Sequence, residues 1–177
     1  MENPKKEILG FIVYLAVIFL AVYFIITFVG QRTKVNGGSM EPALQSGDNL
    51  LMDKLSYRFR DPERYEVIIF PCPTKPEEYY IKRIIGLPGE TVQITDREVY
   101  IDGEKLEGED YGIAPIDDPG MAAEPITLGE DEYFVLGDNR PISNDSRYEA
   151  VGPIHKDDIE GRALVRITPI SKIGWVK

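Results

Sequence analysis

The sequence has few of the residues that bind metals or form disulfides. Cys72 is the one cysteine among 177 residues, so no intrachain disulfide can form and the redox compartment stays unmarked. His155 is the one histidine, and it lies in the polar run 155–158. A single histidine of this kind argues against a His-rich metal site and against a Ser-His-Asp triad. We expect neither a metal nor a cofactor.

Positive charge is also scarce. The chain has 20 Lys and Arg against 30 Asp and Glu, for a net charge of −10, which disfavours nucleic acid as a partner. The acidic residues concentrate in residues 96–132, where only Arg97 and Lys105 are basic, and the rest of the chain is nearly neutral. The pattern predicts a solvated acidic insertion attached to a balanced core.

Charged residues are absent from Ile8 to Val29, where Ile, Leu, Val, Phe and Ala predominate. A helix of this length spans roughly 33 Å at about 1.5 Å per residue, close to the roughly 30 Å of a bilayer core. A cleaved signal peptide would have a shorter apolar region, of about 7–15 residues, and a small-x-small site. Since residues 28–32 contain no such site, we predict a retained single-pass anchor in residues 1–30 and one further domain in 31–177.

Basic residues flank this segment almost equally. Lys5 and Lys6 precede it, whereas Arg32 and Lys34 follow it. The positive-inside rule therefore does not decide the orientation from charge alone.

Residues after the anchor show short apolar runs and neither repeats nor a sustained helical period. Turn residues such as Asp102-Gly103 and the prolines Pro71 and Pro73 separate these runs. The predicted strands are 49–53, 66–70, 79–85, 92–95, 99–101, 133–136 and 159–168. The composition of residues 107–130 predicts an excursion or a flexible loop. The fold class is therefore mostly β, with short antiparallel strands.

A glycine pair precedes a serine just beyond the anchor, in the stretch 36–42. Gly37 and Gly38 allow a close backbone approach and positive φ directly before Ser39. Pro42 then fixes the chain direction. Such a bend would expose a nucleophilic hydroxyl, although Gly-Gly-Ser also occurs in ordinary turns.

A lysine within an apolar strand offers a base for that serine. Alternation along the strand 79–85 places Lys82 and Arg83 on opposite faces. Burial disfavours the ammonium form, so a desolvated Lys82 would have a lowered pKa and could accept a proton from a hydroxyl. The alternative is an edge-strand lysine that blocks aggregation.

Polar residues crowd the loop 137–147, directly after an apolar strand. Such a loop is costly to bury unless its groups pair. Asp145 and Arg147 are spaced for an ion pair, and Asp138 could reach a separate arginine such as Arg83. A hydroxyl from Ser143 or Ser146 could orient the lysine amine, whereas a well-paired turn without chemistry remains the alternative.

These three motifs, taken together, resemble those of a known protein family. Behind the anchor come Gly38-Ser39-Met40-Glu41-Pro42, Tyr80-Ile81-Lys82-Arg83-Ile84 and Gly137-Asp138-Asn139-Arg140 with the residues up to Arg147. In this order they resemble the bacterial type I signal peptidases, the membrane-anchored Ser/Lys leader peptidases, in the compact form of Gram-positive bacteria. The resemblance implies a β-rich catalytic domain with a membrane-facing apolar surface, outside the cell membrane, and a cytoplasmic amino terminus.

The resemblance also implies roles for the residues that match the family motifs. Ser39 would be the acylated nucleophile, Lys82 the general base, and Ser143 the residue that holds the lysine amine. Arg83 with Asp138, and Asp145 with Arg147, would form structural ion pairs; Ser146 would support the site, and Met40 would lie by the substrate groove.

The sequence departs from the family pattern at three places. Gly37 replaces a hydroxyl residue that helps some members bind the oxyanion, so that hole would rest on backbone N–H groups, notably that of Ser39. The strand that usually begins Gly-Asp reads Tyr65-Glu66. The family glycine after Arg147 is replaced by Ala150 or displaced to Gly152.

The resemblance predicts an endopeptidase that removes signal peptides from exported pre-proteins, typically after Ala-x-Ala, at the lipid bilayer. One rival is a self-cleaving Ser/Lys repressor-type peptidase, which would need a DNA-binding domain and no anchor. The rival from another class is a catalytically silent, membrane-tethered β module whose acidic segment 96–132 binds a partner.

Overall fold

The computed structural model describes residues 4–24 and 30–176. Helix α1 (Pro4–Phe24) covers the first part of the predicted anchor, and residues 25–29 of that anchor lie outside the described residues. All the described side chains of α1, residues 7–23, are exposed. Within the described part of the chain, no helix combines the length and the apolar character needed to cross a membrane.

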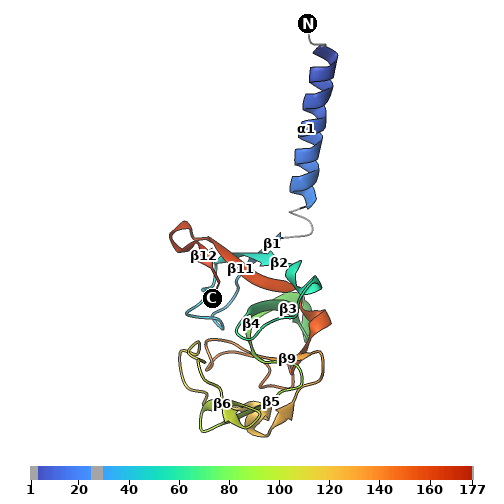
Figure 1. The fold of residues 1–177 in the computed structure, drawn as a ribbon. Helices are drawn as coiled ribbons and strands as arrows, with labels where there is room; N and C mark the ends of the chain where they lie inside the picture. The colour runs from blue at the N-terminus through green and yellow to red at the C-terminus, as the bar shows by residue number, and fades with distance from the viewer. Residues whose placement is uncertain (1–3, 25–29, 177) are drawn as a thin grey trace.

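The remaining described residues form two antiparallel sheets (Figure 1), so the predicted mostly β fold is confirmed. The large sheet has eight strands in the order β1-β2-β11-β3-β4-β9-β10, with β12 paired to β11. Its strands are β1 (Gly30–Lys34), β2 (Asn49–Asp53), β3 (Val67–Cys72), β4 (Lys75–Gly86), β9 (Glu132–Leu136), β10 (Ile154–His155), β11 (Gly161–Thr168) and β12 (Gly174–Trp175).

The small sheet has four strands in the order β7-β6-β5-β8. They are β5 (Thr91–Thr95), β6 (Glu98–Ile101), β7 (Glu104–Lys105) and β8 (Ile126–Thr127). Short helical turns complete the fold: η2 (Ser56–Arg58), η3 (Gly120–Ala123), η4 (Lys156–Asp158) and η5 (Ile170–Lys172). The predicted hairpin turn joins β6 to β7, with φ of 53° at Asp102 and 83° at Gly103.

Strands β3 and β4 extend beyond their predicted ends. Pro71 does not stop β3, which continues to Cys72, because a register shift in the pairing with β4 falls between these two residues. Residues 75–78, which lie outside the predicted strand 79–85, likewise belong to β4. Strand β4 is exposed over its first five residues and buried from Ile81 onward. It therefore runs from the surface into the core.

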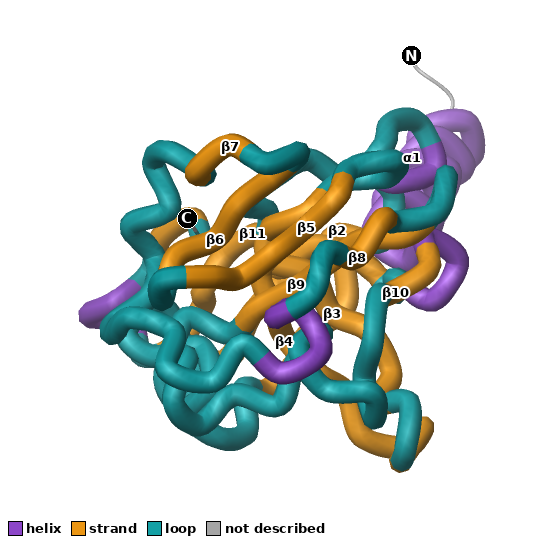
Figure 2. Tube along the Cα trace, turned by 90° about the horizontal axis from the view of Figure 1, so that it is seen from below, coloured by secondary structure: helices purple, strands orange, loops and turns teal. Residues whose placement is uncertain are grey.

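Residues 96–132 are more than a solvated insertion. Their apolar side chains, with those of β5, pack against the ends of β4 and β9, and Figure 2 shows the small sheet lying across these strands. This buried cluster comprises Ile85, Val92, Ile94, Val99, Ile116, Ala122, Leu128, Phe134 and Leu136. The acidic residues keep much of this region polar at its surface, while the intervening apolar residues give it a core.

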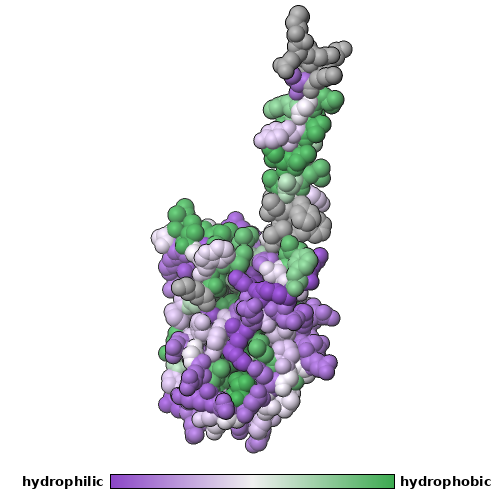
Figure 3. All heavy atoms as spheres, viewed as in Figure 1, coloured by the Kyte–Doolittle hydropathy of each residue, from purple (hydrophilic) through white to green (hydrophobic). Residues whose placement is uncertain are grey.

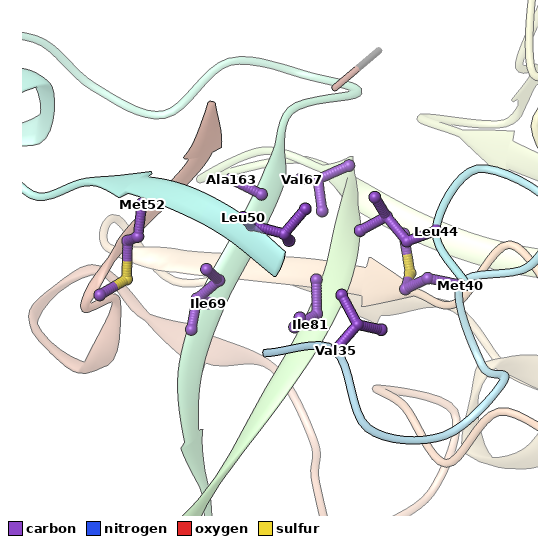
Figure 4. Close-up of a cluster of buried hydrophobic side chains, with 9 residues drawn as sticks. All are labelled: Val35, Met40, Leu44, Leu50, Met52, Val67, Ile69, Ile81 and Ala163. Carbon is purple, nitrogen blue, oxygen red and sulfur yellow. The ribbon is translucent and has the colours of Figure 1, made fainter. Parts of the chain in front are cut away.

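A second cluster lies beneath the serine turn and is drawn in Figure 4. Val35, Met40 and Leu44 come from the segment after β1, and they meet Ile69 of β3 and Ile81 of β4. These contacts fix the serine turn against the strand that carries Lys82.

Gly86, the last residue of β4, is packed closely against Val92 of the small sheet. A Cβ atom here would lie 2.5 Å from Val92 Cγ2 and 2.9 Å from Leu128 Cδ1. We expect Gly86→Ala to lower the free energy of unfolding by about 1–3 kcal/mol through overpacking. Denaturant unfolding measures this change, with Gly174→Ala as the control because nothing lies within 4 Å of its Cβ position. Equal effects of the two substitutions would contradict this packing.

Candidate active site

The Ser39 turn is held at its base by backbone hydrogen bonds. Val35 N donates to Asp48 O at 2.8 Å, and Gly47 N donates to Val35 O at 2.9 Å. Gly37 has φ of +89°, in the left-handed region that favours glycine. Met40 is buried in the core, so it anchors the turn although its residue also borders the groove described below. Ser39 consequently projects from a fixed bend.

Lys82 lies on β4, opposite this bend, and is 3% exposed. Its Nζ donates hydrogen bonds to Ser39 Oγ at 2.9 Å and to the carbonyl oxygen of Ile81 at 3.2 Å. The Nζ also lies 4.9 Å from the centre of the Tyr80 ring. Burial lowers the pKa of Lys82 to about 8, although the carboxylates of Asp145 and Asp138 act in the opposite direction.

Two ion pairs flank Lys82 from the loop 137–147. Arg83 donates from Nε and Nη2 to the carboxylate of Asp138, at 2.8 and 2.7 Å. Arg147 donates to Asp145 from Nε at 2.8 Å and from Nη2 at 3.0 Å. All four residues are buried. Bidentate pairs of this kind satisfy charges that would otherwise be costly in the interior.

Backbone and hydroxyl contacts fix the rest of this loop against the serine turn. Asn139 donates from its backbone N to Ser39 O at 3.0 Å, and from Nδ2 to Gly38 O at 3.2 Å. Ser146 Oγ accepts a hydrogen bond from Val135 N at 3.0 Å. The loop is thus joined both to the backbone of Gly38 and Ser39 and to strand β9.

Ser143 makes no side-chain hydrogen bond within the described part of the chain. Its Oγ is buried and has no hydrogen-bond partner among the described residues, so the expected contact with the Lys82 amine is not made in this structure. The hydroxyl lies instead against Gly137, where a Cβ atom would be 2.2 Å from Ser143 Oγ and 2.5 Å from Ser39 O. Gly137 therefore allows the loop to approach Ser39 closely.

Arg140 and Glu109 form an ion pair that the sequence analysis did not anticipate. Arg140 Nη1 donates to Glu109 Oε2 at 3.1 Å, and its Nη2 pairs with the other carboxylate oxygen. Arg140 Nε donates to Gly137 O at 3.0 Å. No spacing rule links Glu109 to Arg140, because the pair joins two separate loops. Only the unusual polarity of 137–147 marked Arg140 for attention.

A groove of about 830 Å³ leads to Ser39 and Lys82. Residues 31–40 and 77–82 line it, together with Ile142 and Asn144. Strand β1 is the end strand of the large sheet, and β9 pairs with β4 only from Arg83 onward. The groove therefore runs between two strand edges that have no strand partner among the described residues.

Backbone N–H groups are the available oxyanion donors beside Ser39. Within the described part of the chain, the Ser39 N–H has no acceptor, whereas Gly37 N donates to Ser46 Oγ at 3.3 Å. Among residues 4–24 and 30–176, no group of three or more His, Cys, Asp or Glu side chains is placed to hold a metal ion. The arrangement presents a hydroxyl, a buried amine and a free amide at one point.

Comparison with known proteins identifies the family. The family model described as signal peptidase, peptidase S26, matches residues 8–168. The chain belongs to this family. Being a signal peptidase, it is a hydrolase of the serine type, and its family cleaves the signal peptides of exported pre-proteins.

Individual relatives extend the comparison. The chain is 42% identical over 154 residues to a probable signal peptidase I-2 of Synechocystis, covering 84% of this chain and 67% of that one. It is 31% identical over 182 residues to signal peptidase IB of Staphylococcus aureus, covering 95% and 93% respectively. A crystal structure of a signal peptidase I from Enterococcus faecalis is 36% identical, with a TM-score of 0.45 over 58% of this chain and 97% of that chain. The family model and the two sequence relatives confirm the resemblance to the bacterial type I enzymes.

The pKa of Lys82 gives a prediction for the pH dependence of this signal peptidase. If Lys82 acts as a general base it must be neutral, and its neutral fraction rises with pH through a pKa of about 8. We expect kcat/KM for a pre-protein substrate to rise about tenfold per pH unit well below pH 8 and to level off above it. A flat profile from pH 6 to 9 would contradict this assignment.

Proposed function

We propose that the chain cleaves signal peptides with Ser39 as nucleophile and Lys82 as general base. The observation that carries the proposal is the 2.9 Å hydrogen bond between Lys82 Nζ and Ser39 Oγ, with the amine buried. A buried amine of lowered pKa can accept the hydroxyl proton near neutral pH, which an exposed lysine does poorly.

In the first half-reaction, Ser39 Oγ attacks the scissile carbonyl carbon while Lys82 Nζ takes the hydroxyl proton. The oxyanion receives a hydrogen bond from the free Ser39 N–H, because Gly37 supplies no side-chain donor. Collapse breaks the C–N bond, and the Lys82 ammonium gives its proton to the departing amine of the mature protein. The signal peptide remains as an ester on Ser39.

In the second half-reaction, the neutral Lys82 takes a proton from a water molecule that attacks the ester. The C–O bond to Ser39 breaks, and the proton passes from Lys82 to the serine oxygen. Both residues return to their starting state. We assign Ser143 to this stage or to the substrate complex, where rotation of its free hydroxyl would let it bind the lysine amine.

We propose that the substrate binds as an extended strand in the groove between β1 and β4. Unpaired backbone groups on both walls suit the addition of a peptide strand. Cleavage after Ala-x-Ala is carried over from the family resemblance, and we include it in the proposal.

We also propose a membrane-anchored arrangement, with residues 1–30 as cytoplasmic terminus and anchor and residues 31–177 as an extracytoplasmic catalytic domain. The uncharged run Ile8–Val29 supports this proposal, and β1 begins directly after it. Near the level of β1, exposed apolar side chains gather over the β11–β12 hairpin (Figure 3). These are Ile170, Ile173 and Trp175, with 83%, 59% and 70% exposure. We expect them to contact the bilayer, which confines enzyme and substrate to one surface.

Purified protein incubated with a pre-protein in detergent tests the mechanism. We expect Ser39→Ala and Lys82→Ala each to reduce cleavage by at least about 10³-fold, because either change removes a member of the nucleophile–base pair. Lys75→Ala, an exposed lysine at the start of the same strand, serves as the control and keeps wild-type activity. Substrates with Ala-x-Ala and Ala-x-Phe at the site test the specificity. Wild-type cleavage by either active-site variant would refute the pair.

A further inference from the structure

Residues 107–121 form a segment that we name the acidic strap. The sequence predicted an excursion or a flexible loop for this segment, but it packs against the catalytic loop 137–147. It contacts three buried arginines, Arg83, Arg140 and Arg147, each of which also binds a group of the loop 137–147. The strap therefore covers the side of the loop that carries the ion pairs.

Glu109 supplies the charged contact of the strap. Its carboxylate pairs with both terminal nitrogens of Arg140, whose side chain is 2% exposed. Gly112 lies directly against the same guanidinium, since a Cβ at this position would be 3.0 Å from Arg140 Cζ. Arg140 in turn binds Gly137 O, the glycine packed against Ser39 and Ser143. One chain of contacts thus links Glu109 to the nucleophile's backbone.

Tyr111 supplies the aromatic contact. Its ring centre lies 3.9 Å from Arg83 Cζ and 5.1 Å from the ring centre of Tyr65. Tyr65 has φ of 71°, a conformation that is strained for a residue with a side chain. It stands where the family strand usually has glycine, and its hydroxyl donates to Glu107 O at 3.0 Å. The strained tyrosine is thus packed onto the strap, while its carbonyl accepts a hydrogen bond from Arg83 Nη1 at 2.9 Å.

The end of the strap binds the second ion pair. Arg147 Nη1 donates to Asp118 O at 3.1 Å, and Met121 N donates to Arg147 O at 2.8 Å. Ile113 N donates to Asp138 O at 3.0 Å, so the middle of the strap is also bonded to the loop. Both carboxylates that flank Lys82 belong to pairs that the strap contacts.

We propose that the acidic strap holds the catalytic loop closed over Lys82, with Tyr111 and Glu109 as positioning residues of the reaction. The inference rests on the proposed roles of Ser39 and Lys82. Release of the strap would loosen the Arg83–Asp138 and Arg140 contacts and admit water to the amine. Because burial is the main cause of the lowered Lys82 pKa, hydration would raise that pKa. Less neutral amine would then be present at any pH below about 8.

The first test replaces Tyr111 in the full-length protein and measures kcat/KM against pH. For Tyr111→Ala we expect the acid limb, the part of the profile in which kcat/KM rises with pH, to move about one pH unit higher. At a pH well below the midpoint of this rise, kcat/KM would be about tenfold lower than in the wild type. Tyr111→Phe keeps the ring over Arg83 and restores the wild-type limb. Tyr100→Ala is the control, because Tyr100 is a half-buried tyrosine of the small sheet that pairs with Gln93 and Lys105.

The second test compares two neighbouring charges on the strap. We expect Glu109→Gln to reduce kcat/KM by about tenfold or more, since misplacement of the loop by about 1 Å can cost about 10²-fold. Glu109→Asp restores part of this loss. Asp110→Asn removes the same charge from an exposed neighbour and stays within about twofold of wild type.

Thermal unfolding of each variant separates positioning from folding. The proposal would be overturned if folded Tyr111→Ala had a lower kcat/KM at every pH but an unshifted pH profile. An equal shift of the profile in Tyr100→Ala would also overturn it. If Tyr111→Ala does not fold, the Glu109 and Asp110 pair decides, and equal effects of these two variants would overturn it. Failure of the proposed function looks different, because Ser39→Ala or Lys82→Ala would then cleave like wild type.

Discussion

Burial of one lysine amine against one serine hydroxyl is the constraint on which the rest of the site depends. Lys82 is 3% exposed, and its pKa falls from 10.5 to about 8 because the charged form is poorly solvated. That shift corresponds to about 3 kcal/mol of unfavourable free energy for the protonated amine in the folded chain. Strand β4 makes this burial possible, since it enters the core at Ile81 and continues through Gly86.

The surrounding architecture keeps this amine dry while satisfying the charges beside it. Asp138 and Asp145 lie close enough to act on Lys82, yet each is bound by an arginine. Gly137 brings the loop into contact with Ser39, and any side chain at this position would meet Ser39 and Ser143. The acidic strap closes the outer side of the same loop. The strap thus limits the movement of the loop 137–147, and this loop limits the movement of the residues around Lys82.

Much of this arrangement could be predicted from local sequence. The alternation of Lys82 and Arg83, the hairpin turn at Asp102-Gly103 and most strand positions follow from short-range rules. Other features depend on contacts between distant segments, which no local pattern records. The Glu109–Arg140 pair joins two loops, the free hydroxyl of Ser143 depends on loop packing, and β1 and the first half of β4 are polar strands. The strap was predicted to be a loop because its composition is acidic, and local sequence does not identify the few residues, such as Tyr111, that pack inward.

Direct titration of the Lys82 amine by NMR measures whether its burial leaves it neutral near physiological pH. Protein labelled at the lysine side chains, with Lys82→Ala used to assign the resonance, reports the midpoint without reference to turnover. We expect a midpoint near pH 8, because burial lowers the pKa of Lys82. A midpoint near the ordinary lysine value of 10.5 would contradict this expectation, because the amine would then be protonated at neutral pH and unable to act as the base.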